Sequence, residues 1–174
     1  MKIIKFFLFL IVTFFYSNII IASENFAYVD MAKLLNDSDA GKSLTIQLTK
    51  IHKQNIVNLE KIATNLKKDE KEILAKKNIL SKEEFEMKLS ELRLKAKDYN
   101  NERKAKNDLL NKKRNDARKN LLQLINPILT DYANQNSISM IFEKKNIIMG
   151  KTNLDITNKI LITLNSKIKK IEIN

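Results

Sequence analysis

The chain has 174 residues, a formal net charge of +12 and an isoelectric point near 9.7. Its two Gly and one Pro exclude collagen-like folds and turn-rich β folds, which need many of these residues. The absence of Cys excludes disulfides and thiolate chemistry. The excess of basic residues indicates an acidic partner, such as nucleic acid, anionic lipid or an anionic protein surface.

The N-terminal residues 1–22 have the layout of a secretory signal peptide. Two lysines precede an apolar run from Phe6 to Ala22, and the small residues Ala22 and Ser23 end it. We expect export across the inner membrane to the periplasm, with cleavage after Ala22 or Ser23. The alternative is an uncleaved anchor, because the run is near the lower limit of ~17 residues for a membrane span. Export favours anionic lipid, lipopolysaccharide or unfolded exported proteins as the acidic partner.

Residues 42–126 predict a helical hairpin arm. From Lys42 to about residue 77, apolar residues recur at steps of mostly three and four, with no Gly or Pro after Gly41 to interrupt them. The capping-box pattern from Ser81 to Glu84 predicts that a second helix starts there, so the tip of the hairpin lies near residues 78–81. The two helices would be ~55 Å and ~80 Å long and would pack as an antiparallel pair.

The second helix has an apolar heptad seam whose pattern weakens in the middle. Apolar residues follow the heptad frame from Phe85 to Tyr99, but Arg103, Lys106 and Lys113 occupy the following seam positions. The pattern becomes strongly apolar again after residue 120, where Pro127 should kink or restart the helix. We therefore expect arms that are flexible in the middle of the second helix.

Residues 23–41 and 127–174 predict a small β-containing association body. Residues 26–30 and 137–143 have the pattern of strands, and residues 146–149 predict a second strand that closes a hairpin. A helical turn is expected at 31–36, and a final helix from Leu154 to about Ile168, capped by Asn153 or Asp155. A body this small exposes strand edges and has a thin core, so we expect self-association through the sheet.

The basic excess lies entirely on the predicted arm. Residues 42–126 contain 22 basic and 12 acidic residues, whereas residues 23–41 and 127–174 contain 8 of each. A single lysine on a charged helix is usually only solvated, but a net charge of +10 on one hairpin indicates a surface for an acidic partner. The candidate binding residues on the second helix are Lys104, Lys106, Lys112, Lys113, Arg114, Arg118 and Lys119.

The sequence has no motif that indicates catalysis. It lacks a nucleophile elbow, a glycine-rich phosphate loop, a zinc-protease helix and an EF-hand. His52 lies beside the apolar stripe of the first arm helix and is expected to be a surface residue. We therefore expect no enzyme activity, no cofactor and no metal.

The whole region after the signal peptide resembles the Skp/OmpH family of periplasmic chaperones for outer membrane proteins. The resemblance rests on a short strand reading FAYVD before Met31, two long basic helices, and the segment from residue 125 to 157, INPILTDYANQNSISMIFEKKNIIMGKTNLDIT. Its most specific part is YA, then ISMIFEKKNIIMG, then LDIT. The arms resemble those of the family only in being long, basic helices.

The resemblance implies an α+β, mainly α fold, in which long antiparallel coiled-coil arms extend from a small β body formed by trimerisation. Three arm pairs would surround a cavity that holds unfolded outer-membrane β-barrel precursors without ATP. The candidate trimer-interface residues are Val29, Ile138, Met140, Ile141, Phe142, Ile147 and Ile148. The family is also proposed to have a lipopolysaccharide site, whose positions fall here on Lys112 and Lys113, with Glu102 in place of a lysine and Arg103 beside it.

Two other functions remain open. An uncleaved N-terminus would make the chain a structural or tethering coiled coil of the cell envelope, and its mass after export would reveal the retained residues. Charge alone would permit a nucleic-acid binder. The arms, however, have a single aromatic residue after Phe85, Tyr99, and therefore no platform for stacking bases, and the signal peptide argues against this partner.

Overall fold

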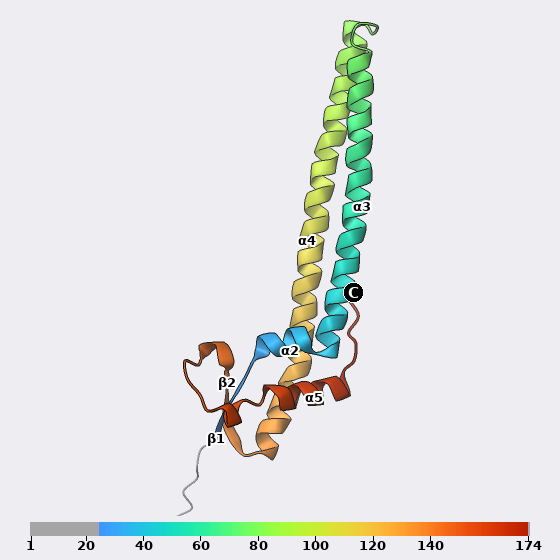
Figure 1. The fold of residues 1–174 in the computed structure, drawn as a ribbon. Coiled ribbons are helices and arrows are strands. Elements are labelled where there is room, and N and C mark those ends of the chain that lie inside the picture. The colour runs from blue at the N-terminus through green and yellow to red at the C-terminus, as the bar shows by residue number, and fades with distance from the viewer. Residues whose placement is uncertain (1–24, 174) are drawn as a thin grey trace, which may run out of the picture.

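The computed structural model describes residues 25–173 and consists of one long helical hairpin on a small body (Figure 1). The predicted signal peptide lies outside the described residues. The elements in chain order are β1 (Asn25–Val29), α2 (Met31–Asp37), α3 (Asp39–Ala75), α4 (Lys82–Gln135), β2 (Ile138–Glu143), the 3₁₀ helices η1 (Lys144–Asn146) and η2 (Thr152–Leu154), and α5 (Thr157–Lys167). This order confirms the predicted fold class, mainly α with a small β part.

The two arm helices start at capping residues that the sequence places there. The Ser38 hydroxyl accepts a hydrogen bond from the Gly41 N–H at 3.1 Å and begins α3. At the tip, the Ser81 hydroxyl accepts from the Glu84 N–H at 3.2 Å, and the Glu84 carboxylate accepts from the Ser81 N–H at 3.0 Å. The same carboxylate also accepts from the Ser81 hydroxyl at 2.9 Å. The bond from the backbone N–H, and after it the one from the hydroxyl, lower the pKa of Glu84. The predicted capping box is confirmed.

The second arm helix continues through its proline. α4 runs unbroken from Lys82 to Gln135 with Pro127 inside it, so the helix does not restart there. Its C-cap is Asn136, and the next residue, Ser137, has a φ of 51°, in the left-handed region that reverses the chain at many helix ends. After this turn the chain continues into β2, which lies beside β1.

The sheet differs from the one that the sequence predicts. β1 pairs in parallel with β2, so that Phe26 lies opposite Met140 and Tyr28 opposite Phe142. The predicted strand at 146–149 is wrong. η1 turns the chain directly after β2, and the apolar run that follows extends into solvent, with Ile148 and Met149 almost fully exposed. β1 takes the place beside β2 that a hairpin partner would occupy.

The core of the body includes the lower ends of both arm helices. Its largest fully buried apolar side chains come from α2, α4 and α5: Leu34, Leu121, Ile125, Ile160 and Leu164. Ala40 at the start of α3 is fully buried with them. The last buried residue is Leu44 along α3, and the first along α4 is Leu110. Between residues 45 and 109 no residue is buried. The core therefore extends into the root of the arm, residues 42–44 and 110–126, and the rest of the arm has no buried residue.

The segment after α5 returns to the base of the arm and ties it to the body. The Gln47 side-chain amide donates to the Ile171 carbonyl at 2.7 Å and accepts from the Ile173 N–H at 3.2 Å. Lys169 forms an ion pair with Asp39 at 3.0 Å. Because Ile171 and Ile173 also pack against the core, the tail fixes the first turns of α3 on a second side.

Candidate functional site

The arm is held together by a narrow, partly buried seam. The predicted seam residues of α4 from Phe85 to Tyr99 are half-buried, and most of the apolar stripe on α3 faces them, although Ile56 is exposed and Asn55 takes its place. Lys95 on α4 donates to the carboxylate of Asp69 on α3 at 2.7 Å. This hydrogen bond, together with the charge of Asp69, raises the pKa of Lys95. Because its seam is only partly buried, we expect the arm to be flexible.

Apolar side chains outside the seam are exposed along the arm. They lie on both helices and near the tip, between the charged residues: Ile46, Ile56, Val57, Leu74, Ile79, Met87, Leu94 and Leu109. Single exposed apolar residues are common on protein surfaces. Here they recur along a surface with a large basic excess, so the arm offers both long-range attraction to acidic chains and many small apolar contacts.

The structure divides the predicted basic residues of α4 among different faces. With ~100° of rotation per residue, Arg114 and Arg118 lie beside the seam, whereas Lys112 and Lys119 lie on the opposite face. The seam's other flank has two half-buried lysines, Lys106 and Lys113, and Lys106 forms an ion pair with Glu102 at 3.3 Å. Lys104 is exposed. The seven predicted residues therefore surround the helix.

The positions implied for lipopolysaccharide do not form one patch. Arg103 and Lys112 are nine residues apart on α4, which places them about half a turn from each other around the helix. Lys113 lies at the flank of the seam, and the acidic Glu102 adjoins Arg103. A single anionic head group would meet these residues on different faces.

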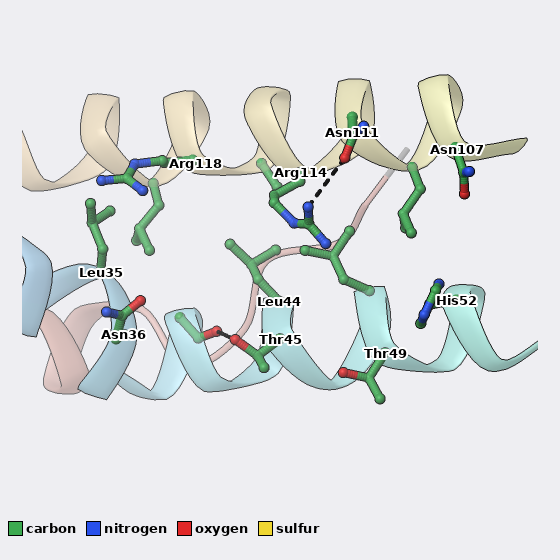
Figure 2. Close-up of a pocket in the computed structure, with 15 residues that line it drawn as sticks. Leu35, Asn36, Leu44, Thr45, Thr49, His52, Asn107, Asn111, Arg114 and Arg118 are labelled. Carbon is green, nitrogen blue, oxygen red and sulfur yellow. Dashed lines mark hydrogen bonds between the residues drawn. The ribbon is translucent and has the colours of Figure 1, made fainter. Parts of the chain in front are cut away.

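A groove of about 560 Å³ opens between α3 and α4 at the root of the arm (Figure 2). Its floor is apolar, with Leu44 and Leu110 buried, and its walls include Arg114, Arg118 and His52. His52 is an exposed residue, as predicted. Sequence reasoning identified the two arginines as basic surface and missed the groove, although the small and polar residues at the facing positions of the two helices are its signal.

The body presents an apolar patch on its sheet. Phe26, Met140 and Phe142 are exposed, and the rings of Phe26 and Phe142 lie 6.1 Å apart between centroids. Within residues 25–173 only β1 pairs with β2, so the outer edge of β2 has no strand beside it. These residues and this edge form the surface that the predicted self-association would cover.

The other predicted interface residues differ in exposure. Val29 is only 2% exposed and packs in the core of its own chain, so we remove it from the candidate interface. Ile138 and Ile141 pack partly against the same core, and Ile147 is half-buried. Ile148 is fully exposed in the turn after η1.

A cluster of polar groups from residues 155–157 and Lys144 lies beside β1, on the side away from β2. The Ile156 N–H donates to the Tyr28 carbonyl at 3.0 Å, and the carboxylate of Asp155 accepts from the Thr157 N–H at 3.0 Å and from Lys144 at 2.9 Å. Burial acts to raise the pKa of Asp155, but the hydrogen bonds that its carboxylate accepts outweigh burial and lower the pKa, the one from the Thr157 hydroxyl first and then those from Lys144 and the Thr157 N–H. The cluster fixes the start of α5 against β1. The predicted start of this helix at Leu154 is wrong, because η2 precedes it and α5 begins at Thr157, but Asp155, one of the two predicted caps, does bind its first N–H.

The part of the chain that the structure describes contains no group of His, Asp and Glu side chains that could hold a metal ion. Nor does any helix in residues 25–173 have the length and apolar character needed to cross a membrane.

Comparison with known proteins identifies the family. Residues 25–164 match the family described as outer membrane protein (OmpH-like). A similar fold occurs in a protein of Caulobacter crescentus CB15 that has the provisional name outer membrane chaperone (OmpH-like), with a TM-score of 0.81 and 18% identity over 86% of this chain and 88% of that chain. No curated protein matches. The family match covers most of the sequence, and the chain therefore belongs to the OmpH-like family.

Proposed function

We propose that this protein is a periplasmic chaperone that holds unfolded outer-membrane β-barrel precursors, without ATP, and prevents their aggregation before membrane insertion. Family membership and the name of the structural neighbour support the chaperone role. The observation behind the holding mechanism is the arm itself. It is strongly basic, has exposed apolar side chains along its length, and has no buried residue between positions 45 and 109.

The arm suits a client that must be captured early and released without fuel. Chains that form β-barrels alternate apolar and polar residues along each strand. A basic surface attracts an acidic chain over about one Debye length, ~10 Å at 0.1 M salt, before contact is made. Scattered apolar contacts are weak one by one, so the client stays bound through many of them and leaves when a folding partner takes them over.

Self-association would place several arms around one client. We propose a homotrimer, the assembly that the family resemblance implies. The exposed patch of Phe26, Met140 and Phe142 and the unpaired edge of β2 support an interface in the body, because a small sheet with open edges and exposed aromatic side chains favours pairing with another copy.

Suppression of client aggregation tests the chaperone role and locates it on the arm. A urea-unfolded outer membrane protein is diluted into buffer with the chaperone, and light scattering is followed. Changing Lys112, Arg114, Arg118 and Lys119 together to Gln should slow capture. The matched change of four exposed body lysines, Lys145, Lys151, Lys159 and Lys170, to Gln removes the same charge and should have little effect. Raising the salt from about 0.1 M to about 1 M should weaken capture of acidic clients. Loss of capture in the body variant alone would contradict the arm mechanism.

The interface proposal has its own test in sedimentation. Phe142→Asp places a charge on the exposed patch without disturbing the core of the chain, because this side chain is 46% exposed. The variant should sediment as a monomer with unchanged helical content, since burying an unpaired carboxylate at an interface is costly. A variant that still sediments as a trimer would show that the patch is not the interface.

The alternative, a tethering protein with an uncleaved N-terminal anchor, differs in mass. The exported protein should lack its first 22 or 23 residues if the signal peptide is removed. A retained N-terminus, together with absence of aggregation suppression, would favour the tether.

A further inference from the structure

The groove at the root of the arm has the dimensions of a short extended peptide. Along α4 it reaches from Asn107 to Leu121, and a helix rises ~1.5 Å per residue, so the groove is ~20 Å long. An extended chain advances ~3.3 Å per residue, so about six residues span it. Its volume of about 560 Å³ is within the range of sites that bind ligands.

The charge in the groove is one-sided. Arg114 and Arg118 lie one helical turn apart on α4 and line the same wall, and no Asp or Glu is among the lining residues. Within residues 25–173, the guanidinium of Arg114 donates only to Asn111, at 3.2 Å, and that of Arg118 has no hydrogen bond or ion pair. Two neighbouring cations that lack a carboxylate partner favour an anionic ligand.

The neutral polar groups of the groove distinguish a peptide from an acyl chain. Asn107 on α4 and Thr49 on α3 line the groove from its two sides. Their side chains have no hydrogen-bond partner in the described part of the chain. Figure 2 shows Asn107 and His52 pointing toward the space between the helices. A hydrocarbon tail would cover these groups and leave them unpaired, which is costly. A peptide backbone has N–H and C=O groups that pair with them.

The root of the arm already binds one extended segment in this way. The amide of Gln47, which lies between the lining residues Leu44 and Leu48, pairs with the backbone of Ile171 and Ile173 in the C-terminal tail. The isoleucines of that tail pack on the core. Side-chain amides combined with an apolar floor are therefore a binding mode that this part of the fold uses.

We propose that the groove is a docking site for an extended peptide segment in which acidic side chains alternate with apolar ones, and that in the working chaperone this segment belongs to the unfolded client. The carboxylates pair with Arg114 and Arg118, and the apolar side chains pack on Leu44 and Leu110. This rests on the proposed function and adds to it a defined site in each copy, separate from the diffuse contacts along the arm.

Binding of a labelled peptide tests the proposal. The probe is a short fluorescent peptide of alternating Glu and Leu, measured by anisotropy on the full mature chain, with a Gln and Leu peptide as the uncharged probe. The variant is Arg114→Gln with Arg118→Gln. The control is Lys112→Gln with Lys119→Gln, which removes the same charge from the opposite face of the same helix. All four residues are exposed, so both variants should fold, as circular dichroism will check.

The expected result is a preference for the acidic peptide that depends on the groove. The Arg variant should bind it about tenfold more weakly, as expected for two partly exposed ion pairs, and the Lys control about twofold more weakly or less. Equal losses in the two variants would overturn the proposal, because the basic surface as a whole would then be responsible. Tighter binding of dodecanoate than of the peptide would assign the groove to an acyl chain instead.

Two further readouts separate this inference from the proposed function. If the wild-type chain suppresses client aggregation but shows no affinity for the acidic peptide, the groove proposal fails and the holdase proposal stands. If the wild type does neither, the holdase proposal fails as well. A changed sedimentation coefficient in the Arg variant would show that a second copy of the chain occupies the groove, which also overturns the proposal.

Discussion

Replacement of Gly41 by Ala tests the joint from which the arm departs. Gly41 is buried in the first turn of α3, directly after the short connection from α2. A Cβ at this position would lie 2.0 Å from the carbonyl oxygen of Leu35 and 2.8 Å from its carbonyl carbon, where ordinary contact begins at 3.4 Å. Both neighbours are backbone atoms, so they can move only if α2 and α3 separate.

The sign of the change in the free energy of unfolding shows whether the clash at the joint or the helix propensity of Ala has the larger effect. Ala is favoured over Gly in a helix by ~1 kcal/mol, so propensity alone predicts a more stable protein. Overpacking of a buried site costs ~1–3 kcal/mol, and here the clash with backbone places it at the upper end. We expect a net loss of ~1–2 kcal/mol in the free energy of unfolding, which corresponds to a fall of ~2–8 °C in Tm for a chain of this size.

Guanidinium denaturation at a fixed protein concentration measures this loss. Asn65→Ala on the exposed surface of α3 is the control for propensity and should be neutral or slightly stabilising. Gly150→Ala is a second control, in which the added Cβ meets a side chain and not the backbone. Its Cβ would meet a ring atom of Tyr28 at 2.9 Å, and a side chain can shift, so we expect a smaller loss. A Gly41→Ala protein as stable as the Asn65→Ala protein would refute the clash.

Three other predictions follow from the packing. Truncation after residue 167, or Gln47→Ala, should lower the stability and quicken hydrogen exchange in the first turns of α3, because both remove the tail's hold on the arm. Asp155→Asn should destabilise the protein at neutral pH. That difference should vanish in acid titrations as the pH falls below ~3.9 and through the lowered pKa of Asp155, since a carboxylate with a depressed pKa stabilises only while ionised. Amide exchange should be faster across residues 100–109 than across 121–133, which include the fully buried Leu121 and Ile125; equal protection would show that the arm packs as tightly as the body.

Features that depend on neighbouring residues could be predicted from the sequence. The capping box at Ser81 and Glu84 fixed the start of α4 because both hydrogen bonds form within one turn of helix. The heptad seam from Phe85 to Tyr99 was also predictable, since its period alone decides which face is covered. The charge partition between arm and body required only a count.

Features that depend on distant segments could not be predicted. The apolar run at 146–149 follows β2 at hairpin distance, but β1, more than 100 residues earlier, pairs with β2 instead. The local pattern also cannot show that Val29 is buried in its own chain, because the core residues that cluster with it come from distant parts of the sequence, α4 and α5 among them. The groove arises where α3 and α4 meet, so each helix alone gives only half of its lining.

Site-specific cross-linking of a bound client tests the central claim most directly. A photoreactive residue is placed at Leu94 on the arm or at Ile162 on the body, two positions of similar exposure, 60% and 70%. Each protein is mixed with a urea-unfolded outer membrane protein during dilution, irradiated, and examined for the covalent adduct. The arm mechanism predicts strong cross-linking at position 94 and little at position 162. Strong cross-linking at 162 with little at 94 would contradict it.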